Sequence, residues 1–202
     1  YGPIKKILIE DIVISCSDKK WKNLTIENLS AMSTGHYNSS FHYSDEDSLA
    51  SVNFIFNELN HDEKVNFSCN NYPKRKKPGT IFVYQTSNTY LIGTSLNNLL
   101  FDKEENDFFS DLLVPIFDRH NFSEKIKFTR RTDDVRQQPY TGWGMFLHRE
   151  DLVNLNLLLQ SPNRNEYFSN EFIDEGLQKT DDKGLLAIKE AVINLLPQKH
   201  PC

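Results

Sequence analysis

Apolar residues follow two different periodicities along this 202-residue chain. Apolar positions three and four residues apart, the spacing of a helix, extend over residues 24–32, 49–59, 108–117, 144–159 and 181–196. Short runs rich in β-branched and aromatic residues, which favour strands, lie at residues 4–14, 64–69, 80–84, 89–93 and 125–129. The polar residues 85–88 are typical of a turn that would join two of these runs in a hairpin. The pattern predicts an α+β domain with a mixed, mostly antiparallel central sheet flanked by helices.

Length and charge narrow the classes of partner. A chain of 202 residues with 38% hydrophobic content can bury one core of ordinary size, so a single domain over residues 1–202 is expected. No apolar run approaches the roughly 20 residues that span a bilayer, so we expect no membrane partner. The net charge of -5 and the pI near 5.7 give no general reason to expect nucleic acid. The expected partners are proteins.

The three cysteines, Cys16, Cys69 and Cys202, are odd in number and far apart in the sequence. This spacing argues against a disulfide framework and favours a reducing compartment. None of the cysteines has the spacing of metal ligands, so we expect no metal site, and nothing in the sequence indicates a cofactor.

A short basic run stands out in this acidic chain. It consists of Lys74, Arg75, Lys76 and Lys77, between Pro73 and Pro78. The two prolines favour an extended, exposed backbone. The simplest interpretation is a solvated loop, and the functional alternative is an anion patch that serves as a nuclear import signal, an inositol phosphate site or a contact for an acidic partner.

One segment carries a resemblance to a known family. Gln137 is followed six residues later by Trp143 and then by Gly144, Met145 and Phe146. This segment resembles the active-site region of the ubiquitin-like-protein-specific proteases (the Ulp/SUMO-protease family), where a glutamine of the oxyanion hole lies six residues before the catalytic cysteine. The resemblance implies the fold of the clan that also holds adenovirus-type proteases and YopJ-type effectors. It implies a protease-like core over residues 79–159 and a C-terminal helical extension over residues 160–202.

The positions that would carry catalysis are degenerate. The resemblance places the nucleophile at Trp143, the general base at Gly79 and the residue that orients the base at Thr94. An indole cannot attack a carbonyl, glycine has no side chain to accept a proton, and a threonine hydroxyl cannot stabilise an imidazolium as a carboxylate would. Only the oxyanion-type Gln137 is retained. The chain is therefore expected to be an inactive member of the family, and whether it is an enzyme is left open.

The functional hypothesis is a pseudoprotease domain that binds a protein, with ubiquitin or a ubiquitin-like protein as the first candidate. The residues expected to line the binding channel are Trp143, Gly142, Thr80 and Phe82. The abundance of Asn and Lys is typical of an AT-rich genome, which favours a bacterial or viral effector in a host cytosol or nucleus. Two alternatives stay open: an active cysteine protease or deubiquitinase in which Cys16 or Cys69 pairs with His36, His42 or His120, and a structural domain of a larger polypeptide.

Overall fold

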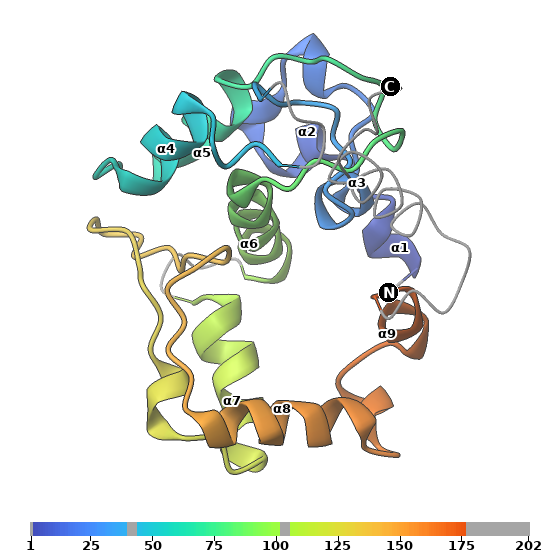
Figure 1. Cartoon of the computed structure of the whole chain (residues 1–202), viewed down its shortest axis with the longest axis vertical. Helices are drawn as coiled ribbons and strands as arrows, with labels where there is room; N and C mark the ends of the chain where they lie inside the picture. Colours follow the sequence, from blue (N-terminus) through green and yellow to red (C-terminus); the bar gives the residue numbers. More distant parts are fainter. Residues whose placement is uncertain (1, 40–43, 102–105, 177–202) are drawn as a thin grey trace, which may run out of the picture.

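The computed structural model describes residues 2–39, 44–101 and 106–176, and within these ranges the chain is helical. Figure 1 shows helices joined by irregular segments, and β-pairing in the described ranges is limited to isolated bridges, without a sheet. The α+β fold with a mixed central sheet, and with it the Ulp-like architecture, is therefore wrong. The helix expected over residues 181–196 lies outside the described residues, as does Cys202.

The helices vary in length from one turn to four. The α-helices are α1 (Gly2–Lys5), α2 (Ile9–Ile12), α3 (Ile26–Ser30), α4 (Leu49–Phe56), α5 (His61–Asn70), α6 (Thr86–Leu100), α7 (Val114–Arg119), α8 (Arg149–Gln160) and α9 (Asn170–Gly176). The short 3₁₀ turns are η1 (Ile14–Cys16), η2 (Lys19–Trp21), η4 (Glu124–Lys127) and η5 (Arg164–Glu166), and η3 (Phe109–Leu113) is a π-helical turn. Four expectations are confirmed, namely the helices near residues 24–32, 49–59 and 108–117 and the short helices after residue 164. Pro115 lies in the first turn of α7, where its missing N–H costs no helical hydrogen bond.

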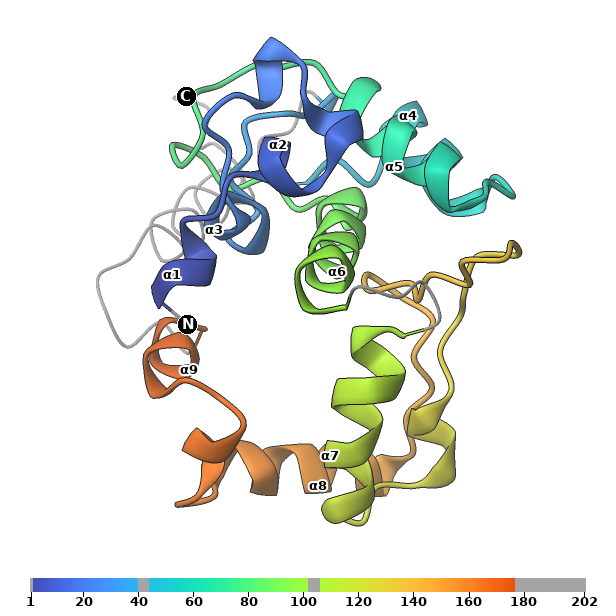
Figure 2. The ribbon, with the colours of Figure 1, turned by 180° about the vertical axis from the view of Figure 1, so that it is seen from behind.

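Helix α6 replaces the turn and the second strand of the expected hairpin of residues 80–93, and residues 80–85 before it are irregular. It lies between the N-terminal helices and the α7–α8 region in both views (Figures 1 and 2). Its buried face is lined largely by small polar residues, and two of their hydroxyls bond to the helix itself: Thr94 Oγ1 donates to the Tyr90 carbonyl (3.0 Å) and Ser95 Oγ to the Leu91 carbonyl (2.7 Å). Because these hydroxyls are satisfied within the helix, they can be buried without loss of hydrogen bonds, and burial outweighs the strand propensity of the segment.

Helix α5 replaces the strand expected at residues 64–69. Asn60 is its N-cap, and Asn60 and Glu63 form a reciprocal capping box, with bonds of 2.9 and 3.0 Å. The N-terminal run of residues 4–14 is helical as well, because its buried residues Ile9 and Val13 are four apart rather than two. Both errors of expectation came from weighting β-branched residues above helix signals.

Two hydrophobic clusters hold the described chain together. The first surrounds α6 from the N-terminal side and consists of Ile9, Val13, Cys16, Trp21, Leu24, Ile26, Leu29, Phe54, Val65, Cys69, Tyr90, Leu91 and Tyr140. The second consists of Phe108, Phe109, Phe117, Phe122, Ile126 and Leu158. The strand expected at 125–129 is largely the turn η4, whose Ile126 enters the second cluster. A capping box of His148 and Asp151 begins α8 at Arg149, five residues later than expected.

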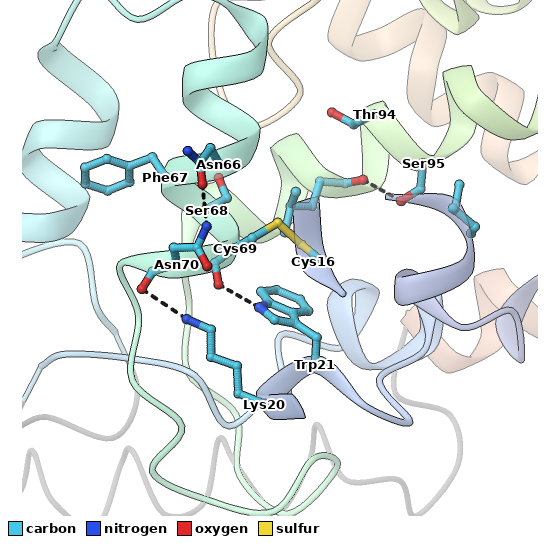
Figure 3. The surroundings of a disulfide bond; sticks show 12 residues. Cys16, Lys20, Trp21, Asn66, Phe67, Ser68, Cys69, Asn70, Thr94 and Ser95 are labelled. Carbon is cyan, nitrogen blue, oxygen red and sulfur yellow. Dashed lines mark hydrogen bonds between the residues drawn. A yellow bond between two sulfur atoms is a disulfide. The ribbon is translucent and has the colours of Figure 1, made fainter. Parts of the chain in front are cut away.

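A disulfide joins Cys16 to Cys69, across 53 positions of sequence (Figure 3). Both cysteines are buried in the first cluster. The bond links η1 to α5, and the Trp21 indole beside it donates a hydrogen bond to the Cys69 carbonyl (2.7 Å). The expectation of unpaired cysteines is therefore wrong, and the argument for a reducing compartment loses its basis, since disulfides persist in oxidising compartments.

Candidate functional site

The segment that carried the family resemblance lies along the first cluster rather than at a helix start. Residues 130–144 fold back on themselves: Thr132 N donates to the Gln138 carbonyl (3.0 Å), Tyr140 N to the Arg130 carbonyl (2.8 Å) and Arg130 N to the Gly144 carbonyl (3.1 Å). A Cβ atom at residue 144 would lie 2.5 Å from Arg130 Cβ, and φ there is +96°, so the close pairing requires Gly144. This pairing keeps Gly144 out of a helix.

Trp143 forms one wall of an aromatic box around a buried lysine. The Lys64 Nζ atom lies 4.8 Å from the ring centroid of Phe54, 5.1 Å from that of Tyr140 and 5.8 Å from that of Trp143. It donates a hydrogen bond of 2.8 Å to the Phe54 carbonyl in the last turn of α4. Such a carbonyl lacks an intrahelical partner and carries the negative end of the helix dipole, so a cation is favoured there.

No carboxylate of the described residues pairs with this lysine. Lys64 is fully buried, and its burial, together with the positive charge of Arg130, lowers its pKa from 10.5 to about 8. The ammonium is held by ring faces and one carbonyl alone. Because Lys64 already fills the box, Trp143 packs against a cation from its own chain instead of closing a channel for the tail of another protein.

The three degenerate catalytic positions are not brought together. Gly79 lies in the left-handed region (φ 74°) and its N–H donates to the Ser33 carbonyl (2.7 Å), whereas Thr94 is buried within α6. None of the hydrogen bonds or ring contacts in the described part of the chain joins Gly79, Thr94 and Trp143. Gln137 is exposed, with φ 46°, and its N–H donates to the Asp134 carboxylate (3.0 Å). Its role is that of a turn residue.

The remaining residues of the expected channel are also dispersed. A Cβ atom at Gly142 would lie 2.5 Å from Thr86 Cγ2, so Gly142 allows residues 141–143 to pack closely against the first turn of α6. Thr80 is exposed, and its hydroxyl donates to the Lys77 carbonyl (2.6 Å). Phe82 is half-buried on the segment that precedes α6. These residues do not form a site with Trp143.

The rearranged thiol site has no free thiolate at either proposed cysteine. Cys16 and Cys69 are bonded to each other. His42 lies outside the described residues, and the His120 ring packs against Tyr167 at 5.2 Å. Among the described residues no three His, Cys, Asp or Glu side chains lie close enough to hold a metal ion.

His36 is a buried histidine beside the basic run. Its ring is buried, its Nε2 atom lies 3.0 Å from the Lys20 carbonyl, and it packs edge-on against Trp21 at 4.7 Å. Its Nδ1 atom has no hydrogen-bond partner. Burial lowers the pKa of His36 from 6.5 to about 4, so the imidazole is neutral at pH 7.

The backbone of the basic run is hydrogen-bonded to residues 35–37. The backbone N–H groups of Arg75 and Lys76 both donate to the Gly35 carbonyl (2.8 and 3.2 Å), and His36 forms a β-bridge with Lys74. The four basic residues are exposed. The structure therefore presents the proposed anion patch on a fixed backbone.

An apolar surface, here called the α8 face, is the largest group of exposed apolar side chains along the described sequence. It consists of Phe128, Met145, Phe146, Leu147, Leu152, Val153 and Leu157, each between 43% and 66% exposed. Phe128 and Phe146 lie two residues beyond the paired Arg130 and Gly144, at the same end of the paired segments. On α8, Val153 and Leu157 point away from Leu158, which is buried in the second cluster.

The sequence contained signals for part of this arrangement. The Asn60–Glu63 capping box places Lys64 on the inward face of α5, with Ser68 one turn further along. Nothing in the sequence indicated that Phe54, Tyr140 and Trp143 would meet around it. No helix of the described residues is long and apolar enough to cross a membrane. No protein-family model matches the chain, and no curated protein matches it at a significant level.

Proposed function

We propose that this chain is a protein-binding module and that the α8 face is its contact surface. The observation that carries the proposal is the exposure of seven large apolar side chains within and beside one helix. We propose that these side chains form one surface, because continuous apolar surfaces are characteristic of protein interaction sites, whereas single exposed apolar residues are common and carry no such meaning.

The opposite side of α8 explains why this surface is held in place. Leu158 packs into the second cluster, and the Asp151 carboxylate accepts hydrogen bonds from the backbone N–H and hydroxyl of Ser123 (both 2.6 Å) and from His148 N (2.8 Å). The helix is therefore anchored by one face and by its N-terminus. A partner would meet a preformed apolar ridge, which lowers the entropy lost on binding.

Ubiquitin and ubiquitin-like proteins are the first partners to test. The support for this class is the resemblance of residues 137–146 to the protease family. The inactive-protease form of the hypothesis requires the protease fold, which the described residues lack, so we propose the binding role without that architecture. Since the disulfide occupies both proposed nucleophiles, we do not propose hydrolysis.

The proposal is tested by titrating the full-length, isotope-labelled chain with ubiquitin and with SUMO, followed by NMR. Val153→Asp and Leu157→Asp place charges on the α8 face, and Leu49→Asp is the matched control, because Leu49 is exposed on the separate helix α4. Micromolar binding, about 8 kcal/mol, that is lost with the two α8 variants and retained with the control supports the proposal.

Two results would contradict the proposal. Binding that survives both α8 substitutions would place the contact elsewhere on the chain. Absence of binding to both proteins would exclude the ubiquitin-like class, and the assignment of the face to a structural role in a larger polypeptide would then be favoured.

A further inference from the structure

A second surface, distinct from the α8 face, gathers positive charge from two distant parts of the sequence. Its first part is the run Lys74, Arg75, Lys76 and Lys77. This run is fixed to residues 33–37 by a ladder of backbone bonds: Tyr37 N to the Pro73 carbonyl (3.2 Å), Arg75 N to the Gly35 carbonyl (2.8 Å) and Gly79 N to the Ser33 carbonyl (2.7 Å). A Cβ atom at Gly35 would lie 2.3 Å from the Lys76 carbonyl oxygen, so only glycine allows this approach.

The second part is Lys20, which follows Cys16 in the sequence, whereas the basic run follows Cys69. Its Nζ atom donates to the Asn70 carbonyl (3.0 Å), immediately after Cys69 and shortly before the basic run (Figure 3). Its own carbonyl accepts from His36 Nε2 (3.0 Å), which assigns the proton to that nitrogen. Since His36 forms a β-bridge with Lys74, this bond places the Lys20 backbone next to the segment that is paired with the run.

The lysines of this surface are not neutralised. None of the ion pairs in the described part of the chain involves Lys20, Lys74, Lys76 or Lys77. The Asp18 carboxylate interacts electrostatically with Lys20. The Asp45 carboxylate is buried and accepts hydrogen bonds from Asn38 N and Gln85 Nε2. A chain with a net charge of -5 thus keeps a local positive field at one place.

The surface offers an anion single contacts with lysine ammonium groups rather than bidentate contacts with a guanidinium. The Arg75 guanidinium, the group best suited to a bidentate grip on phosphate or carboxylate, is partly engaged: Nε donates to the Tyr37 carbonyl (3.0 Å) and Nη2 to the Asn38 carbonyl (3.5 Å). The lysine ammonium groups remain. Both tyrosines of these segments, Tyr37 and Tyr72, are buried, so the surface has no ring for base stacking from them.

The disulfide points to the compartment in which this surface works. Cys16 and Cys69 flank its two parts, and a disulfide of this kind persists in oxidising surroundings. Nuclear import signals and inositol phosphate sites act in reducing compartments, so the bond disfavours those interpretations of the run. A linear polyanion with many separate monovalent charges, present in oxidising surroundings, fits the lysines best.

We propose that Lys20, Lys74, Lys76 and Lys77 form one binding surface for a sulfated polysaccharide, and that the Cys16–Cys69 disulfide and Gly35 hold its two parts in register. Arg75 acts as the internal anchor of the surface through its bonds to the backbone. The surface is independent of the α8 face, so a protein partner and the polyanion could bind to one molecule together.

The test is binding of heparin to the full-length oxidised chain at 150 mM NaCl (about physiological ionic strength), measured by calorimetry. The triple variant Lys74→Ala, Lys76→Ala and Lys77→Ala should bind more than about tenfold more weakly, because fewer counterions leave the polyanion when fewer lysines bind it. The matched control is Lys6→Ala, Lys125→Ala and Arg149→Ala, which removes the same charge from exposed residues elsewhere and should bind as the wild type does.

Gly35→Ala separates the register of the surface from its charge. It changes no charge but should displace the run from residues 33–37 and weaken heparin binding, with the helical content checked by circular dichroism. Equal binding by Gly35→Ala and wild type, or equal loss in the control triple variant, would overturn the proposal. Binding of duplex DNA or of phosphoinositide vesicles as tight as that of heparin through the same lysines would overturn the assignment to sulfated polysaccharide.

Discussion

Reduction of the Cys16–Cys69 disulfide should strongly destabilise the fold. The bond closes a loop with a sequence separation of 53 residues and lies within the first hydrophobic cluster. Breaking it frees the unfolded chain from that closure and leaves the contact between η1 and α5 to packing and to the Trp21–Cys69 hydrogen bond. The change to make is chemical reduction of the wild type, without any substitution in the core.

The magnitude follows from the length of the loop. The chain-entropy relation gives about 4 kcal/mol at 25 °C for a loop of this size. A domain of ordinary stability has about 5–15 kcal/mol in total, so the reduced chain would retain a small part of it or unfold. With a urea m-value of about 2 kcal/mol/M, the midpoint of unfolding should fall by about 2 M.

The assay is urea unfolding of the Cys202→Ser variant, oxidised and reduced, followed by circular dichroism. The substitution removes the third cysteine of the sequence, which otherwise could exchange with the disulfide. Thiol titration of the unfolded, unreduced variant should find no free thiol. Two free thiols would show that the disulfide is not formed, and the same urea midpoint in both redox states would show that it does not stabilise the fold.

Three further predictions concern the cores. The folded-state pKa of His36 (about 4) is below the unfolded value of 6.5, so the unfolded chain binds the proton first and stability is lost as pH falls from 6.5 through 4. His36→Gln should remove up to about 3 kcal/mol of this loss in urea melts at pH 4 to 7. An unchanged pH profile of stability in this variant would contradict the prediction. For Lys64 the folded-state pKa (about 8) is also below its unfolded value of 10.5, so stability should rise between pH 8 and 10.5. Lys64→Met should abolish this rise and change stability at pH 7 by less than about 1 kcal/mol. A loss above about 3 kcal/mol at pH 7 would show that the charge is needed. Gly93→Ala should destabilise by about 1–3 kcal/mol in the same assay, because its Cβ would lie 2.5 Å from Thr141 Cγ2 and Thr141 is fixed by a bond to the Thr89 carbonyl; a stabilised variant, as helix propensity alone predicts, would contradict the packing.

The sequence predicted helices well where apolar periodicity and packing agree. Leu49 to Phe56 is helical as the spacing indicated, and Ser48 caps it. The same reasoning failed for α6, because hydroxyl and amide side chains occupy most of its buried face. A pattern that weighs only apolar residues cannot detect a polar helix that satisfies its own hydroxyls.

The family resemblance failed for a related reason. It depended on the order of elements between residues 79 and 159, and the second strand of the hairpin in that order was predicted from residues 89–93, which belong to α6. Once the hairpin is absent, Gly79 and Thr94 have no reason to meet Trp143. The contacts that do form around Trp143 join residues from α4, α5 and the 140–143 segment, and sequence alone gives no information about such a meeting.

The basic run was found in the sequence, but its partner Lys20 was not. The disulfide, the hydrogen bonds of Lys20 with Asn70 and His36, and the backbone ladder at Gly35 bring Lys20 to the run. The sequence suggested no pairing because the three cysteines are odd in number and far apart. Pairing depends on the positions of the cysteines in space, which the strand assignments of residues 4–14 and 64–69 had placed wrongly.

The most direct test is the backbone conformation of residues 86–100, because helix α6 stands where the protease-like fold requires the turn and the second strand of a hairpin. Cα secondary chemical shifts of the full-length oxidised chain measure it residue by residue. Helix α6 should give continuous helical shifts from Thr86 to Leu100. Strand-like shifts at residues 89–93, with a turn before them, would contradict the helical fold and restore the hairpin of the protease family.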